Sequence, residues 1–227
     1  MLTGLPLETD RIAIIGPGRL GTAFAYKFGR DDKRVILYYH DADVCKTINR
    51  EHLNPRHLTE DLARRLGGMD QVPRLSPKVH ATNDLERVVE ENDFIFLSVT
   101  MDRLPEILNQ VEPILQHKAT NTCFISAIKG LTAVETTRQL ITPSQLIRNH
   151  FYKLKDRFTV VSIGGPFFDM DIALGNPVCL TVAGAKPICR TVRKEFVGAN
   201  RRELTSLYNF DTVGIEACGA LKPVKGL

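Results

Sequence analysis

The chain has 227 residues, of which 43% are hydrophobic and 25% are charged, and its formal net charge is +4 at pH 7. This length suits one sizeable α/β domain, and this composition is that of an ordinary soluble globular protein. Basic residues form no long run and are not interleaved with aromatic residues, which excludes nucleic acid as an expected partner.

Short apolar runs rich in β-forming residues alternate with longer amphipathic runs, which predicts βα units and a mostly parallel, doubly wound sheet. In the first half, strands are expected over 11–15, 35–39, 78–81 and 94–99, and helices over 21–28, around 44–53, after a cap at Asn83 or Asp84, and over 104–115. The polar stretch 54–77 predicts an excursion from the sheet with a short helix around 62–66. In the second half, strands are expected over 123–128, 159–163, 178–183 and 204–208, and helices over 134–146, 187–197 and 211–222.

The segment GPGRLG at 16–21 lies between the first strand and the first helix, and the second strand ends about 20 residues further on. Gly16 permits a tight turn, Gly18 lets the backbone approach a pyrophosphate, and Gly21 allows close helix–strand packing. The N-terminus of the helix then points at the phosphates. This context predicts a Rossmann-type domain that binds a dinucleotide, NAD or NADP, with a plain βα turn as the alternative.

Two residues after the second strand, His40 and Asp41, stand where the adenosine ribose is normally recognised. The carboxylate of Asp41 favours NAD, because it can accept hydrogen bonds from the ribose hydroxyls. His40 is compatible with the 2′-phosphate of NADP, above all when it is protonated. The choice between the two cofactors therefore stays open.

The cellular setting is predicted from what the sequence lacks. The N-terminus has no basic and apolar leader pattern, and no stretch is long and apolar enough to span a membrane. Five cysteines without C-x-x-C spacing favour free thiols in a reducing cytoplasm, and the scattered histidines indicate no metal site.

Six ordered segments carry a family resemblance: GPGRLGTAFA at 16–25, NPRHL at 54–58, ATNDL at 81–85, SAIKGL at 126–131, GGPFFDMDIALGNP at 164–177 and DTVGIEACGALK at 211–222. In this order and spacing they resemble the soluble NAD(P)-dependent glycerol-3-phosphate dehydrogenases over nearly the whole chain. The resemblance implies hydride transfer between sn-glycerol 3-phosphate and dihydroxyacetone phosphate, a reaction of glycerophospholipid precursor metabolism. It also implies a phosphorylated small molecule as the substrate.

The resemblance assigns residues to the cofactor. Arg19, Leu20 and His40 fall at positions that contact it, and Asp169 falls at a position beside it. All four depart from the family pattern. Arg19 and Leu20 replace a small polar residue and an aromatic one, His40 replaces an arginine, and Asp169 replaces a small residue. Arg19 can meet a phosphate, whereas the carboxylate of Asp169 is expected to repel one.

The resemblance also assigns the catalytic groups. Lys222 matches the general acid–base, Lys129 matches a lysine shared between cofactor and substrate, and Gly165 and Phe167 match positions near the substrate. A lysine can take a proton from an alcohol only where burial or a neighbouring cation lowers its pKa toward neutrality, and Lys129 could supply that cation. The alternative is that both lysines are solvated surface residues.

The resemblance divides the chain into an NAD(P)-binding Rossmann-like domain at 1–209 and a stub of an all-helical substrate domain at 210–227. In the family, that second domain provides an Arg–Asn pair that grips the substrate phosphate, and Pro223 stands where Asn usually follows the lysine. We therefore expect very weak turnover by these residues. Apolar side chains of the last helix (Val213, Ile215 and Leu221) are expected to favour a homodimer.

Two other readings remain. The chain could be a catalytically impaired nucleotide-binding remnant or a truncated product of such an enzyme. It could also be a different β-hydroxyacid-type dehydrogenase, which fits less well because the SAIKGL and GALK segments belong to the glycerophosphate pattern.

Overall fold

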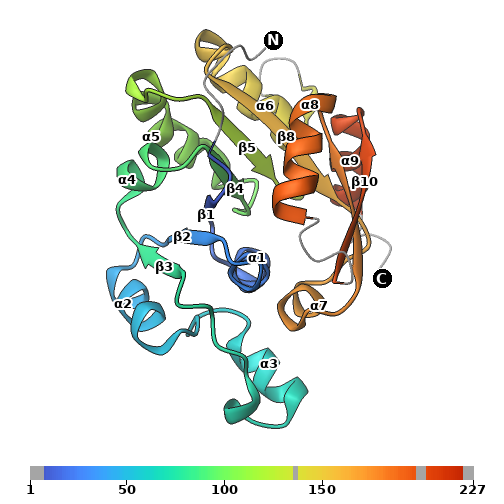
Figure 1. The fold of residues 1–227 in the computed structure, drawn as a ribbon. Helices are drawn as coiled ribbons and strands as arrows, with labels where there is room; N and C mark the ends of the chain where they lie inside the picture. The colour runs from blue at the N-terminus through green and yellow to red at the C-terminus, as the bar shows by residue number, and fades with distance from the viewer. Residues whose placement is uncertain (1–7, 135–137, 198–202, 222–227) are drawn as a thin grey trace.

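The structure, a computed structural model, describes residues 8–134, 138–197 and 203–221. Its main sheet has eight strands (Figure 1). The strands of this sheet are β1 (Arg11–Ile15), β2 (Arg34–Tyr38), β3 (Val79–Thr82), β4 (Phe94–Leu97), β5 (Thr122–Ser126), β8 (Phe158–Gly164), β9 (Val178–Ala183) and β10 (Leu204–Asn209). Two short strands, β6 (Thr132–Ala133) and β7 (Leu140–Ile141), form a separate hairpin.

Helices connect most of these strands. They are α1 (Arg19–Arg30), α2 (Ala42–Glu51), α3 (Thr59–Leu66), α4 (Leu85–Glu90), α5 (Leu104–His117), α6 (Pro143–His150), α7 (Asp169–Leu174), α8 (Lys186–Val192) and α9 (Thr212–Leu221). Shorter turns lie at Met69–Gln71, Tyr152–Leu154 and Arg193–Val197.

The order of strands across the sheet is β10-β9-β8-β5-β4-β1-β2-β3. The chain builds outward from β1 to β2 and β3, then returns to the other side of β1 with β4, β5 and β8, all of them parallel. The strand pair β9–β10 runs in the opposite direction, because β9 is antiparallel to β8 and parallel to β10. The predicted doubly wound, mostly parallel sheet is confirmed. In such sheets, ligands bind where the strand order reverses, which here is the crevice between β1 and β4.

The strands in the middle of the sheet, such as β1, bury side chains on both faces. Ile12 and Ile14 belong to one apolar cluster, which α1, α2, α3, α7 and α8 cover. Ala13 and Ile15 belong to the other, which α4, α5 and α6 cover. Successive residues of a strand point to opposite faces, so two-sided burial produces the nearly unbroken apolar runs seen in the sequence.

The helix expected over 134–146 is wrong. The structure instead has the hairpin of β6 and β7, and α6 begins only at Pro143, with residues 135–137 outside the described part. Proline disfavours helical geometry in the residue before it but suits the first position of a helix. Thr142 and Gln145 complete a capping box there, in which the Thr142 amide donates to Gln145 Oε1 at 2.9 Å.

The last described helix, α9, is fastened to the sheet through one buried carboxylate. Glu216 is only 4% exposed. Its Oε1 accepts from Ser162 Oγ of β8 at 2.8 Å, and its Oε2 accepts from Ser144 Oγ of α6 at 2.7 Å. The backbone amide of Ser144 lies 3.1 Å from Oε1, so the carboxylate also satisfies the first turn of α6.

We expect Glu216→Ala to lower the free energy of unfolding by about 2–4 kcal/mol, because it leaves buried donors on two elements without their charged acceptor. Urea denaturation followed by circular dichroism measures the loss. The matched control is Glu90→Ala on the exposed side of α4, where the change should stay within about 0.5 kcal/mol. Equal losses in the two variants would contradict the anchoring role of Glu216.

Candidate functional site

The glycine loop lies in the crevice between β1 and β4, and close backbone packing accounts for two of its glycines. Gly16 has φ +93°, and a Cβ there would lie 2.8 Å from the amide nitrogen of Val99. A Cβ on Gly21 would clash with the carbonyl oxygen of Gly16 and lie 2.6 Å from Ser98 Oγ. Gly18 differs, because a Cβ there would have no atom within 4 Å. The loop is therefore packed tightly on its inner side and open at Gly18.

Side chains hold the carbonyl groups of this loop on its inner side. Asn54, which is fully buried, donates from Nδ2 to the carbonyl oxygen of Pro17 at 2.9 Å and to Thr22 Oγ1 at 2.8 Å. Thr22 Oγ1 donates to the same carbonyl at 3.1 Å. A trans peptide places its N–H opposite its C=O, so the N–H of Gly18 points away from Asn54. Together with the first amides of α1, it gives the loop the donors that an anion requires.

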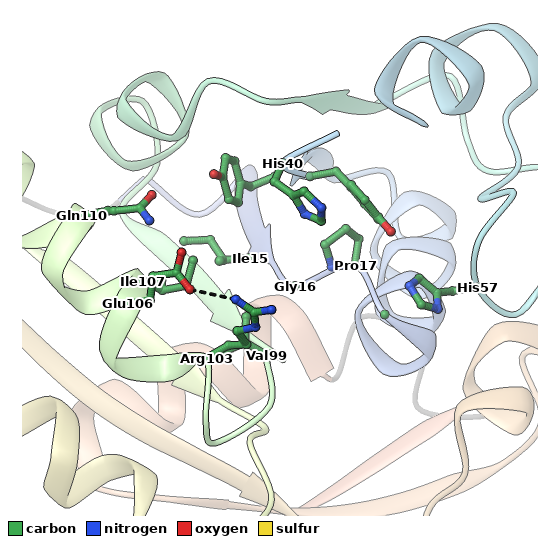
Figure 2. A pocket seen from close by; sticks show the side chains of 13 residues that line it. Ile15, Gly16, Pro17, His40, His57, Val99, Arg103, Glu106, Ile107 and Gln110 are labelled. Carbon is green, nitrogen blue, oxygen red and sulfur yellow. Dashed lines mark hydrogen bonds and ion pairs between the residues drawn. The ribbon is translucent and has the colours of Figure 1, made fainter. Parts of the chain in front are cut away.

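A cavity of about 490 Å³ opens beside the glycine loop and extends past the end of β2 to α5 (Figure 2). Its volume is in the range of small-molecule and cofactor sites. In Figure 2, His40, Pro17 and His57 border one side of it, and the ion pair of Arg103 with Glu106 lies across from them. The lining residues are Ile15, Gly16, Pro17, Gly18, Tyr38, Tyr39, His40, His57, Val99, Arg103, Glu106, Ile107 and Gln110.

The structure brings Gly16, Gly18 and His40 to this cavity, but it gives Asp41 a different set of partners. Asp41 Oδ1 accepts from the amides of Asp43 and Val44 and thereby caps α2. Its Oδ2 lies 3.2 Å from an Arg56 nitrogen. The hydrogen bonds from the two amides, together with Arg56, lower the pKa of Asp41. Recognition of the ribose by Asp41 stays a prediction.

Arg19 and Asp169 are 150 residues apart in sequence but form one ion pair. Arg19 Nε lies 2.6 Å from Asp169 Oδ2, and Arg19 Nη2 lies 3.3 Å from Oδ1. The remaining guanidinium nitrogen pairs with Asp61 of α3. Leu20 is half-buried and packs against the apolar cluster under α1.

Sequence reasoning assigned no role to His57, which the polar excursion after α2 brings to the cavity. The ring of Tyr39 stacks on His40 at 5.1 Å between centroids and lies 6.4 Å from the ring of His57. Burial lowers the pKa of His57, and the positive charges of Arg19 and Arg56 lower it further. The NPRHL segment was the only available signal, and a segment match alone does not say which way a side chain points.

Of the two candidate catalytic lysines, the structure describes Lys129. Lys129 is exposed and follows β5 at the carboxyl edge of the sheet. Gly165 lines a second cavity, of about 380 Å³, together with Leu221 and other residues of α9. Lys222 lies outside the described residues, directly after Leu221. The structure therefore joins Gly165 to the helix that leads to Lys222, and the catalytic roles stay predictions.

Phe167 lies in the core. Its side chain is 4% exposed, and its ring meets the ring of Phe24 edge-on at 6.3 Å between centroids. This contact packs the start of α7, a helix that the sequence did not predict, against α1. A role of Phe167 toward the substrate therefore stays a prediction, and packing is the role that its surroundings support.

Within residues 8–134, 138–197 and 203–221, no group of three or more His, Cys, Asp or Glu side chains could hold a metal ion. Within the same ranges, no helix is both long enough and apolar enough to cross a bilayer.

A family model described as the N-terminus of NAD-dependent glycerol-3-phosphate dehydrogenase matches residues 11–189. Among curated proteins, the glycerol-3-phosphate dehydrogenase [NAD(P)+] of Treponema denticola is 29% identical over 222 residues. That alignment covers 95% of this chain and 57% of the relative, so the chain spans little more than half the length of this relative.

Solved structures show the same fold. The crystal structure of glycerol-3-phosphate dehydrogenase from Coxiella burnetii aligns with a TM-score of 0.74 at 21% identity, over 94% of this chain and 58% of that one. The Plasmodium falciparum glycerol-3-phosphate dehydrogenase aligns with a TM-score of 0.77 at 21% identity, over 94% and 56%.

We expect Asn54→Ala to lower the free energy of unfolding by about 1–3 kcal/mol and to disturb the glycine loop, because the Pro17 carbonyl loses a buried donor. Urea denaturation measures the first effect, and the NMR shift and hydrogen exchange of the Gly18 amide measure the second. The matched control is Asn49→Ala, whose amide bonds to the Ala81 backbone at 2.9 and 2.7 Å, away from the loop. The control should lose stability without moving the Gly18 signal. An unmoved Gly18 signal in Asn54→Ala would refute the inward hold on the loop.

Proposed function

The chain belongs to the NAD-dependent glycerol-3-phosphate dehydrogenase family, whose N-terminal model it matches over residues 11–189, and we propose the following function for it. The chain binds NAD or NADP and supplies the cofactor half of a site that interconverts sn-glycerol 3-phosphate and dihydroxyacetone phosphate. The observation that carries this proposal is the glycine loop, which is open at Gly18 and continuous with the cavity of about 490 Å³.

The residues present fit a dinucleotide. Gly18 leaves room for close approach of a pyrophosphate, and the first amides of α1 supply donors to it. The cavity beyond the loop is lined by aromatic and aliphatic side chains, with His40 and Gln110 among the polar ones, which suits an adenosine group. When bound, the nicotinamide supplies the acceptor or the donor of the hydride.

The chain's own residues handle the proton and the charge in this proposal. Lys222 takes the hydroxyl proton of glycerol 3-phosphate, or returns it to the ketone oxygen in the reverse direction. Lys129 supplies a second positive charge, which lowers the pKa of its neighbour and stabilises negative charge on that oxygen. The position of Lys129 after β5 supports this arrangement, and so does the cavity that Gly165 shares with α9.

We propose the same division of the chain that the sequence predicts, with a cofactor domain at 1–209 and the beginning of a substrate domain at 210–227. The start of α9 at Thr212, directly after the edge strand β10, supports this boundary. The exposed side chains of Val213 and Leu221 support an apolar partner for α9. Because the chain spans 57% of its curated relative, binding and turnover are tested separately.

We expect NADH and NADPH to bind with dissociation constants in the micromolar-to-millimolar range, measured by isothermal calorimetry. Gly18→Ala should weaken binding by about tenfold or more, since the new methyl group enters the space that the pyrophosphate needs. The same variant should keep its melting temperature, because the methyl group meets no protein atom. Gly21→Ala is the contrasting variant and should lose stability as well as binding. The absence of heat with either cofactor would refute the binding function.

We expect Lys129→Met to lower kcat/KM for dihydroxyacetone phosphate by on the order of 100-fold, because a cation beside the reacting oxygen is lost. The loss of NADH absorbance on adding the ketone measures the rate. Lys153→Met is the matched control, because Lys153 is an exposed lysine in the turn Tyr152–Leu154, which precedes β8. This variant should keep the rate of the unmodified protein. Equal rates for the two variants would remove Lys129 from the mechanism.

A further inference from the structure

Three helices meet at the guanidinium of Arg19. Arg19 stands in the first turn of α1, Asp169 is the first residue of α7, and Asp61 lies in α3. The carboxylate of Asp169 contacts two guanidinium nitrogens, at 2.6 and 3.3 Å, and the carboxylate of Asp61 contacts the third nitrogen. The side chain of Arg19 is 46% exposed, so a ligand in solution can reach it.

In this cluster two carboxylates share the guanidinium of Arg19, at the place where the domain would receive a pyrophosphate, and Arg64 pairs with one of them. The N-terminus of α1 favours anions, and in a Rossmann-type domain the pyrophosphate lies there. While Arg19 is paired with these two carboxylates, it is not available to a phosphate, and the nearby carboxylates disfavour the anion. Arg19 is also the residue of this cluster that can bind a phosphate through two of its nitrogens.

Both carboxylates keep other partners if Arg19 turns away. Asp61 Oδ1 also lies 3.2 Å from Arg64, and Asp169 Oδ1 also accepts from the amide of Met170 at 2.8 Å. A separate ion pair, between Arg65 and Asp171 at 3.6 Å, continues to hold α3 beside α7. Exchange of the Arg19 partners therefore leaves the surrounding helices in place.

We propose that Asp61 and Asp169 set the cofactor affinity of this chain by competing with the pyrophosphate of the cofactor for Arg19. The proposal rests on the proposed binding of NAD or NADP and adds the residues that tune it. Binding transfers the guanidinium from the two carboxylates to the phosphates. Removal of either carboxylate then makes Arg19 available in advance and tightens binding, whereas removal of Arg19 weakens it.

The test is calorimetry with NADH, ADP-ribose and adenosine on the full chain. Asp169→Asn and Asp61→Asn should each bind NADH and ADP-ribose about threefold tighter or more, in line with the strength of partly exposed ion pairs. Arg19→Met should bind both about tenfold more weakly. Adenosine lacks the pyrophosphate, so the unmodified chain and these three variants should bind it with equal affinity.

Glu60→Gln is the matched control, because Glu60 is an exposed carboxylate in the first turn of α3, next to Asp61 in sequence. If Glu60→Gln tightened NADH binding as much as Asp61→Asn, a general charge effect would replace the competition. Unchanged or weaker binding by Asp169→Asn would also overturn it, and so would unchanged binding by Arg19→Met. If none of the proteins bound any of the three probes, the proposed function itself would fail and this inference with it, an outcome distinct from the others.

Discussion

The hydrogen bonds from Asn54 to the Pro17 carbonyl and to Thr22 are the interaction on which the rest of the site depends. They join the polar excursion after α2 to the turn between β1 and α1, two segments with no sheet contact between them. With the carbonyl held inward, the Gly18 amide faces outward, and the start of α1 keeps its orientation toward the crevice. The close approach of Gly16 to Val99 fixes the same turn from the β4 side.

Much of the fold could be predicted from the sequence, because its causes are local. Two-sided burial marks strands such as β4 as apolar runs, and the glycines at 16 and 21 mark the turn that only glycine can make. The hairpin before α6 was missed for a local reason as well: the capping signals at Thr142 and Pro143 were outweighed by an apolar pattern that continued across them.

The site could be predicted less completely, since its contacts join distant residues. An aspartate that follows a strand and precedes a helix is equally suited to a ribose and to a helix cap, and the sequence does not reveal that Asp41 bonds to the amides of α2. His57 lines the cavity because of the course of an irregular segment between α2 and α3. Such a segment has no hydrophobic periodicity from which the direction of a side chain could be predicted. In the sequence, Arg19 and Asp169 are two unrelated departures from the family pattern. The fold brings them together as an ion pair, which the sequence does not reveal because the two residues are 150 positions apart.

The reversed strand pair β9–β10 has a consequence for where the described chain ends. Because β10 is antiparallel to β8, the chain leaves β10 toward the ends of the strands that lie away from the glycine loop. The ten residues of α9 then carry it back along β8 over about 15 Å. The bare backbone at Gly164 lets Ile215 lie against β8, and Glu216 fixes the helix to it. These two contacts set the position of α9 along β8 and its rotation about its own axis. A change of one residue before Glu216 in this helix would rotate its carboxylate by about 100° and take it away from Ser162 and Ser144.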